Sequence, residues 1–319
     1  MSSKQVVGLI NPTSLKKFNF DWYEKNEDKE FKTFKNIPDF FVDDESSLTN
    51  IQSEFYNEIK FPNYDEVENF GSLIDKASKS IFAKKLDEEI PLGARILEAG
   101  CGTGQLSIFL SRFNRKIFSI DISKGSLIEA KKFIDKCGIK NVYLSRMNIF
   151  KSFFQENFFD VVISNGVLHH THDTELAFKK IAKLLKPNGY IIIGLYHKQG
   201  RFLHSIRQKV IGKFGKKFSF LDGFFNNNVS DAKKKAWFLD QYKNPWETSH
   251  TASELLGWFK KVNIDYVSSI PFDFNSNQKL FDKREKPSKL SLLIKENSEL
   301  LKLDNLKEGG FFIIIGKKN

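Results

Sequence analysis

The chain has 319 residues, 40% of them hydrophobic, and its 50 lysines and arginines exceed its 39 acidic residues by 11. This content is enough for one large core with a lid or a small accessory unit. The two cysteines, Cys101 and Cys137, fall on separate predicted elements, which disfavours a disulfide framework and fits a reducing compartment. We see neither a secretory signal nor an apolar run of about 18 residues, so we expect a soluble cytoplasmic protein.

The net charge of +11 raises the question of a nucleic-acid partner. Only seven of the 50 basic residues are arginine, although base and phosphate recognition favours the forked guanidinium group. The chain is also rich in Phe, Lys, Asn and Ile, a usage typical of AT-rich genomes. We therefore interpret most of the charge as compositional and expect no nucleic-acid partner.

Residues 1–71 form an N-terminal extension with weak periodicity. It lacks the cysteine pairs that would hold zinc, so no metal is predicted. From residue 72, short apolar runs alternate with helical patterns, which indicates a Rossmann-like, doubly wound, mostly parallel α/β sheet. The predicted strands are 95–99, 116–121, 142–146, 159–164 and 190–195, and the helices between them are 104–113, 124–137 and 173–186.

The alternation breaks over residues 198–250, which hold no clear strand. A helix at 252–260 and strands at 262–268 and 311–316 follow. We therefore divide the chain into the extension 1–71 and a domain 72–319 that carries an insertion at 198–250. An insertion there lies at the carboxyl ends of the strands, where open α/β sheets bind ligands.

The stretch ILEAGCGTGQLSIFL, residues 96–110, joins the first strand to the next helix through three glycines. Such a turn lets the backbone approach a ligand closely and presents helix N–H groups to it. A P-loop would need Gly-Lys-Ser/Thr, and a dinucleotide fingerprint would need glycine where Gln105 stands. The remaining pattern, Glu-x-Gly-x-Gly-x-Gly, resembles class I S-adenosylmethionine (SAM) dependent methyltransferases over residues 72–319.

This resemblance implies a seven-stranded sheet with an antiparallel last strand, and SAM as the cofactor. It assigns Asp121 to the ribose hydroxyls, Ile122 and Ile149 to the adenine ring, and Asn165 and Gly166 to the methionine end. Asn148 stands where the family usually has an Asp that reads the adenine amino group, and its carbonyl oxygen can accept the same bond. The turn itself supplies Glu98, Gly100, Cys101, Gly102 and Gly104.

The resemblance also implies in-line methyl transfer from SAM, giving S-adenosylhomocysteine. Ser164-Asn165-Gly166-Val167 lacks the Asn/Asp-Pro-Pro-aromatic motif of amino-group methylation on adenine or glutamine, and neither cysteine is placed to attack cytosine. The segment NGVLHH most resembles the small-molecule and quinone or sterol branch, so we predict an O, S or N nucleophile on a small molecule. An RNA methyltransferase and a non-catalytic SAM-binding protein remain the alternatives.

Candidate proton acceptors and substrate contacts follow the strand ends. His170 follows the fourth strand, and Tyr196 and His197 follow the fifth; a histidine near its ordinary pKa suits general base work. The aromatic segment 237–250 and the segment before residue 72 suit a small organic substrate, and from them we select Tyr64, Tyr242, Trp246 and His250, with Phe61 as a further test position.

The basic amphipathic stretch 201–218 is a cap, a peripheral membrane contact or a packed surface helix. The oligomeric state is not predicted.

Overall fold

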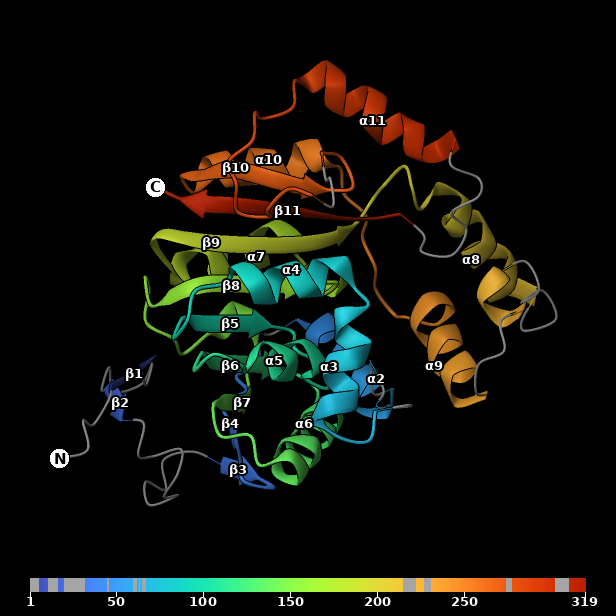
Figure 1. The fold of residues 1–319 in the computed structure, drawn as a ribbon. Helices are drawn as coiled ribbons and strands as arrows, with labels where there is room; N and C mark the ends of the chain where they lie inside the picture. Colours follow the sequence, from blue (N-terminus) through green and yellow to red (C-terminus); the bar gives the residue numbers. More distant parts are fainter. Residues whose placement is uncertain are drawn as a thin grey trace.

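The computed structural model describes residues 6–10, 17–19, 32–44, 46–59, 62, 64, 67–214, 222–226, 231–273, 277–301 and 310–319. Its main feature is a nine-stranded sheet in the order β10-β11-β9-β8-β5-β6-β7-β4-β3 (Figure 1). The strands, in chain order, are β3 (Lys32–Phe34), β4 (Ile37–Asp39), β5 (Arg95–Ala99), β6 (Lys116–Asp121), β7 (Val142–Arg146), β8 (Phe159–Asn165), β9 (Leu185–Tyr196), β10 (Ile264–Ile270) and β11 (Phe311–Lys318).

The strands from β4 to β9 pair in parallel, and β11 is antiparallel to both β9 and β10. The mostly parallel α/β sheet with an antiparallel last strand is therefore confirmed. The hairpin of β3 and β4 extends the sheet beyond the seven predicted strands, because β4 pairs with the otherwise free edge of β7. A separate pair, β1 (Val6–Ile10) and β2 (Lys17–Asn19), is antiparallel.

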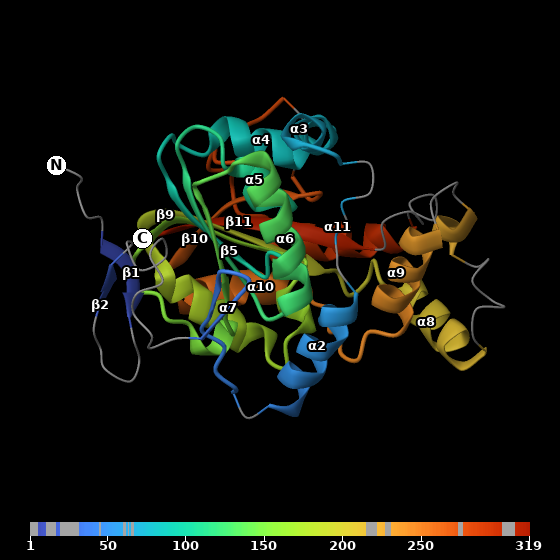
Figure 2. The same cartoon turned by 90° about the horizontal axis from the view of Figure 1, so that it is seen from below.

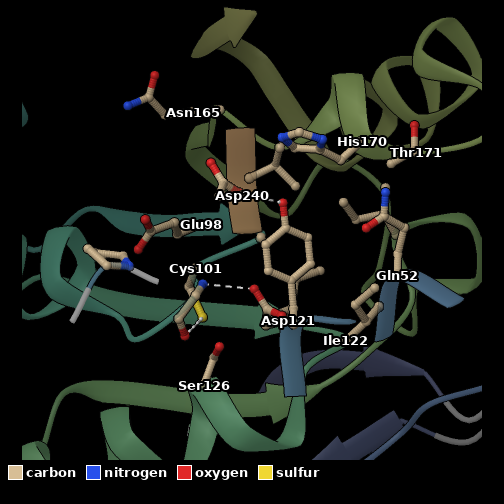
Figure 3. Close-up of a pocket in the computed structure, with 18 of the residues that line it drawn as sticks. Gln52, Glu98, Cys101, Asp121, Ile122, Ser126, Asn165, His170, Thr171 and Asp240 are labelled. Atoms are coloured by element: carbon tan, nitrogen blue, oxygen red, sulfur yellow. Dashed lines mark hydrogen bonds between the residues drawn. The ribbon is translucent and has the colours of Figure 1, made fainter. Parts of the chain in front are cut away.

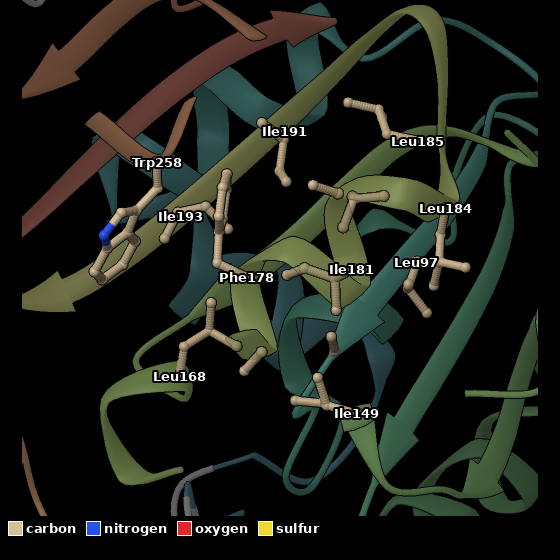
Figure 4. Close-up of a cluster of buried hydrophobic side chains, with 14 of the residues drawn as sticks. Leu97, Ile149, Leu168, Phe178, Ile181, Leu184, Leu185, Ile191, Ile193 and Trp258 are labelled. Atoms are coloured by element: carbon tan, nitrogen blue, oxygen red, sulfur yellow. The ribbon is translucent and has the colours of Figure 1, made fainter. Parts of the chain in front are cut away.

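Helices cover both faces of the sheet (Figure 2). Neighbouring residues of β5 enter different cores: Ile96 packs with α3 (Phe70–Ser78), α4 (Ile81–Glu89), α5 (Gln105–Leu110) and α6 (Lys124–Cys137). Leu97 packs with α7 (Thr174–Leu184) and α10 (Ala252–Lys261), as Figure 4 shows. This alternation follows from the two-residue period of a strand that is buried on both faces.

The loops at the carboxyl ends of the parallel strands meet three further helices, at the right of Figure 1. These are α2 (Ser47–Glu58) from the N-terminal segment, and α8 (Phe202–Phe214) and α9 (Asp231–Tyr242) between β9 and α10. A short 3₁₀ turn, η4 (Gly223–Asn226), lies between α8 and α9, and α11 (Lys289–Leu301) precedes β11. None of the helices in the described ranges is long and apolar enough to cross a membrane.

The stretch between β9 and α10 leaves the sheet and returns to it at one place. The His250 N–H donates to the Tyr196 carbonyl at 2.8 Å, and the Lys198 N–H donates to the His250 carbonyl at 2.9 Å. Both ends of the stretch are thus held beside the end of β9.

The C-terminal end of α2 rests on the start of α6. The Gly125 N–H donates to Asn57 Oδ1 at 3.2 Å, and the Ser123 hydroxyl donates to the Tyr56 carbonyl at 2.7 Å. A Cβ at Gly125 would lie 2.5 Å from the Asn57 carbonyl oxygen, so only glycine allows this approach. The position of α2 therefore depends on a residue of α6.

We expect Gly125→Ala to push α2 away from α6 and to lower the free energy of unfolding by about 1–3 kcal/mol, the usual cost of overpacking. The matched control is Gly257→Ala on α10, where an added Cβ meets nothing within 4 Å. That control should gain about 0.5–1 kcal/mol from helix propensity. Urea denaturation of both variants checks this, and equal effects would contradict the docking of α2.

Candidate active site

A cavity of about 510 Å³ opens at the carboxyl ends of the parallel strands, between α2 and α9 (Figure 3). Many residues selected from the sequence line it: Glu98, Gly100, Cys101, Gly102, Asp121, Ile122, Asn148, Ile149, Asn165, Gly166, His170 and Tyr196. In Figure 3, Asp121, Ile122 and Ser126 lie in the lower half of the view, and Asn165, His170 and Asp240 lie in the upper half. The cavity therefore has two chemically different ends.

The glycine turn after β5 forms part of the first end. Gly100, Gly102 and Gly104 have φ values of +82°, +53° and +74°, which disfavour any residue with a side chain. The N–H groups of Gly100 and Cys101 both donate to the Ile120 carbonyl, at 2.8 and 3.0 Å. Gly104 does not line the cavity; it is the N-cap of α5. The turn thus brings its backbone to the cavity edge.

Asp121 connects the turn to the end of β6. Its Oδ2 accepts the Gly102 N–H at 2.8 Å, and its Oδ1 accepts the Ser123 N–H at 2.8 Å. Burial raises the pKa of Asp121, and these hydrogen bonds oppose that rise. Each carboxylate oxygen keeps further acceptor capacity, so Asp121 can receive two hydroxyl donors from a ligand.

Glu98 and Cys101 lie beside the turn in a desolvated place. The Ser107 hydroxyl donates to Glu98 Oε2, and burial raises the pKa of Glu98 to about 7. Burial also raises the pKa of the Cys101 thiol well above its usual range. Because the thiolate is the reactive form, this shift disfavours Cys101 as a nucleophile, and its 5% exposure is typical of a small packed residue.

Asn148 serves two backbone partners. Its Oδ1 accepts the Phe150 N–H at 3.0 Å, and its Nδ2 donates to the Val42 carbonyl at 3.2 Å. An aspartate could not make the second bond, because a carboxylate has no donor. The N-terminal segment thus gives a physical reason for asparagine at the position where the family pattern has aspartate.

His170 lines the other end of the cavity in a defined tautomer. Its Nδ1 lies 3.1 Å from the Trp246 carbonyl oxygen, which can only accept, so Nδ1 carries the proton and Nε2 carries the lone pair. Burial lowers the pKa of His170, while Asp240 opposes that shift. The ring is therefore neutral at pH 7 and is able to accept a proton at Nε2.

Tyr196 lies beside His170, with ring centroids 5.8 Å apart. Its hydroxyl oxygen accepts the Gln241 Nε2–H at 3.1 Å, and burial raises the pKa of Tyr196 to about 12. Tyr196 therefore stays protonated and offers a hydroxyl hydrogen rather than a base.

The other catalytic candidate, His197, is buried and does not line the cavity. Its Nδ1 accepts the Gly200 N–H at 3.1 Å, and its Nε2 lies 3.8 Å from Glu296 Oε1. Successive residues of a strand point to opposite faces; Tyr196 reaches the cavity, and His197 packs against the rings of Phe272 and Phe312.

The four substrate candidates also lie outside the lining, where they support it. The Tyr64 hydroxyl donates to the Thr103 carbonyl at 2.6 Å, which holds the glycine turn. Tyr242 donates to Asp222 at 2.8 Å, and the Trp246 indole N–H donates to the Thr171 carbonyl at 3.1 Å. His250 contacts the Thr248 and Thr174 hydroxyls at 3.0 and 3.1 Å. Phe61 and part of the stretch 201–218 lie outside the described residues.

Other residues take the places that these four were expected to fill. From the region after β9, Arg201, Trp237, Asp240 and Gln241 line the cavity. Asp240 and Gln241 follow Trp237 by three and four positions, which places all three on one face of a helix. Tyr242 falls on a different face of α9. The helical period within 237–242 was the signal that could have found the lining residues.

Helix α2 closes the cavity from the N-terminal side. Gln52 Nε2 donates to Asn244 Oδ1 at 3.0 Å and to the Trp246 carbonyl at 2.9 Å. The Tyr56 hydroxyl donates to Asp240 Oδ1 at 3.2 Å and accepts from Asn244 Nδ2 at 2.9 Å. Both Gln52 and Tyr56 line the cavity, and no sequence motif distinguishes them, since their role depends on a contact with residues almost 200 positions away.

The comparisons with known proteins agree with this geometry. A family model described as a methyltransferase domain matches residues 92–238. These residues belong to a class I SAM-dependent methyltransferase domain. They span the glycine turn, Asp121 and the end of β9.

Two curated relatives are similar to part of this chain. An uncharacterized protein of Synechococcus sp. is 25% identical over 198 residues, 54% of this chain and 48% of the relative. A ubiquinone biosynthesis O-methyltransferase of Bradyrhizobium diazoefficiens is 32% identical over 101 residues, 32% of this chain and 39% of the relative. The chain thus spans less than half the length of each.

Among solved structures, PKMT2 from Rickettsia typhi matches with a TM-score of 0.53 at 19% identity. The alignment covers 74% of this chain and 52% of that one. At this identity the likeness shows the methyltransferase fold alone.

The pKa of Glu98 makes stability depend on pH. Below the ordinary pKa of a glutamate, about 4.3, both folded and unfolded chains hold the proton. As pH rises toward about 7, the unfolded carboxyl ionises first, so this group lowers the free energy of unfolding over that window.

We therefore expect Glu98→Gln to resist unfolding better than the wild type at pH 8, by up to about 3 kcal/mol, and to match it most closely near pH 4.5. Urea denaturation across this pH range measures the difference. The control Glu88→Gln, on the exposed part of α4, should keep the wild-type fall in the free energy of unfolding as pH rises. The same fall in Glu98→Gln would contradict the raised pKa of Glu98.

Proposed function

We propose that this protein transfers the methyl group of SAM to an O, S or N nucleophile of a small molecule, giving S-adenosylhomocysteine. The observation that carries this proposal is one continuous cavity with the glycine turn and Asp121 at one end and the His170 Nε2 lone pair at the other. Its volume of about 510 Å³ falls within the range for small-molecule sites.

The residues at the first end fit SAM. Asp121 accepts the two ribose hydroxyls, Ile122 and Ile149 flank the adenine, and Asn148 Oδ1 keeps one lone pair for the adenine amino group. Asn165, which lies on the His170 side in Figure 3, and the adjacent Gly166 border the methionine part of SAM, which reaches toward the second end. Gln52 Oε1 is buried without a hydrogen-bond partner in the described part of the chain, and a ligand donor would satisfy it. When bound, SAM supplies an electrophilic methyl group on a sulfonium.

The residues at the second end align and deprotonate the acceptor. The acceptor atom forms its bond to the methyl carbon as the C–S bond breaks, and that electron pair stays on sulfur. The acceptor's proton passes to His170 Nε2. The other ring nitrogen, Nδ1, keeps its proton because it donates to the Trp246 carbonyl. Tyr196 orients the acceptor through its hydroxyl.

A small acceptor is favoured over RNA by the covering of the cavity. Helices α2 and α9 both border the cavity and are joined by the Tyr56–Asp240 hydrogen bond. Arg201 is the one lysine or arginine of the described residues in its lining, whereas RNA binding depends on several cationic side chains. The likeness of part of the chain to a ubiquinone biosynthesis O-methyltransferase also supports a small organic acceptor. We also propose a cytoplasmic location, because Cys101 and Cys137 are both free thiols, which fits a reducing compartment.

The first experiment incubates the purified protein with methyl-labelled SAM and a fractionated cell extract. We expect label in the aqueous small-molecule or organic-soluble fraction. Label in RNA would overturn the small-molecule proposal, and SAM binding without label in any fraction would favour a non-catalytic binder.

His170 gives a sharper test once an acceptor is known. Because burial lowers the pKa of His170, the acid limb of the kcat/KM profile should lie below the ordinary histidine value of about 6.5. We expect His170→Gln, which can keep a donor to the Trp246 carbonyl, to lose about 10²–10⁴-fold in kcat and to lose that limb. A variant with unchanged kcat would exclude His170 as the proton acceptor.

We also propose a peripheral membrane contact through α8. Its Phe202, Leu203 and Ile206 are 55%, 39% and 47% exposed, and Lys209 and Lys213 follow on the same helix. Exposed apolar and cationic side chains on one helix suit an anionic lipid surface. We expect sedimentation with phosphatidylglycerol vesicles and its loss in Phe202→Glu/Ile206→Glu; equal sedimentation of wild type and variant would contradict this contact.

A further inference from the structure

The acceptor end of the cavity holds a buried carboxylate without a cationic partner. Asp240 on α9 lines the cavity and is 7% exposed. Its Oδ1 accepts the Tyr56 hydroxyl at 3.2 Å, and its Oδ2 accepts Gln241 Nε2 at 2.8 Å. No lysine or arginine of the described ranges forms an ion pair with it. Two neutral donors fill only part of the acceptor capacity of a carboxylate, and a buried charge without a counterion is costly.

The arginine at this end is held by other groups. Arg201 Nη2 donates to Glu247 Oε1 at 2.7 Å, and Nη1 donates to Gln241 Oε1 at 3.0 Å. Its guanidinium carbon lies 3.7 Å from the centroid of the Tyr196 ring. No other lysine or arginine of the described chain lines the cavity. Arg201 is thus already paired with Glu247, and no other lysine or arginine among the described lining residues could pair with an acidic ligand.

The walls around Asp240 are aromatic. Tyr56, Tyr196, Trp237 and Phe311 line the cavity with it. The Trp237 indole N–H donates to Asp222 at 2.8 Å, and its ring stacks on Phe224 with centroids 4.4 Å apart, which fixes the ring. Aromatic faces carry negative partial charge and attract cations and polarised hydrogens. A carboxylate among aromatic faces therefore favours a ligand that is cationic or has hydrogen-bond donors.

We propose that the methyl acceptor is a neutral or cationic small molecule that donates an N–H or O–H hydrogen bond to Asp240, and that carboxylate- or phosphate-bearing acceptors are rejected. This inference rests on the proposed methyl transfer and deepens it by naming the acceptor class. Asp240 acts as the residue that determines specificity, because an anionic acceptor would meet an uncompensated carboxylate. The neighbouring His170 Nε2 removes the proton from the acceptor atom, while Asp240 holds the donor in place.

The first test sorts acceptors by charge. Small molecules from a cell extract are separated at pH 7 into cation-exchange, anion-exchange and unretained pools, and each is incubated with the protein and methyl-labelled SAM. We expect label in the cationic or unretained pool. Label in the anionic pool alone would overturn the inference and leave the proposed methyl transfer standing. Absence of label from every pool, with SAM binding intact, would overturn both.

The second test asks whether Asp240 interacts with the methyl acceptor or with the sulfonium group of SAM. With the labelled pool as substrate, Asp240→Asn should lower kcat/KM at least tenfold. The dissociation constants of SAM and of S-adenosylhomocysteine, which lacks the sulfonium charge, are measured by calorimetry and should each change by less than twofold. A loss of SAM affinity well beyond that of S-adenosylhomocysteine would overturn the inference, since the carboxylate would then serve the sulfonium.

Two further variants serve as controls for the effect of Asp240→Asn on kcat/KM and on the two dissociation constants. Asp135→Asn removes one exposed carboxylate of α6 that does not line the cavity, and it should leave kcat/KM and both dissociation constants unchanged. Asp240→Glu keeps the charge and displaces it by one methylene, so KM for the acceptor should rise while SAM affinity holds. Unchanged KM in Asp240→Glu together with unchanged KM in Asp240→Asn would overturn the role of Asp240.

Discussion

The pair of hydrogen bonds from backbone N–H groups to Asp121 is the constraint on which the site depends. Through Gly102 and Ser123, one carboxylate at the end of β6 joins the glycine turn after β5 to the start of α6. The start of α6 in turn receives α2 at Gly125. A single half-buried carboxylate therefore connects the turn, the strand ends and the helix that borders the cavity.

The sequence was sufficient where function depends on local chain geometry. Glycines with positive φ and an acid at a strand end are short-range features, so the turn and Asp121 could be predicted from the sequence. It was insufficient where a side chain meets a distant element. Tyr56 acquires its role only through Asp240, and the β3–β4 hairpin is too short to show a strand period. The aromatic content of 237–250 favours Tyr242, whereas the helical period places Trp237, Asp240 and Gln241 on the face of α9 that lines the cavity.

The two ends of the cavity surround their carboxylates, Asp121 and Asp240, with different partners. At the first end, backbone donors surround Asp121 and leave its outer lone pairs for a ligand's hydroxyls. At the second, Arg201 is matched by Glu247, so Asp240 is left as net negative charge among aromatic rings. In the proposed function, the methyl acceptor completes the charge balance at the second end, so the buried carboxylate of Asp240 limits which acceptors fit.

The return of the chain at His250 to the end of β9 has an evolutionary consequence. Because Lys198 and His250 are hydrogen-bonded neighbours, the roughly fifty residues between them can be lengthened, shortened or exchanged with little strain on the sheet, since loop-closure cost grows slowly with length. Arg201, Trp237, Asp240 and Gln241 all belong to this stretch. Acceptor preference could therefore diverge among descendants of this chain while the nucleoside end stays fixed, provided that each replacement keeps partners for Gln52 and Tyr56 on α2.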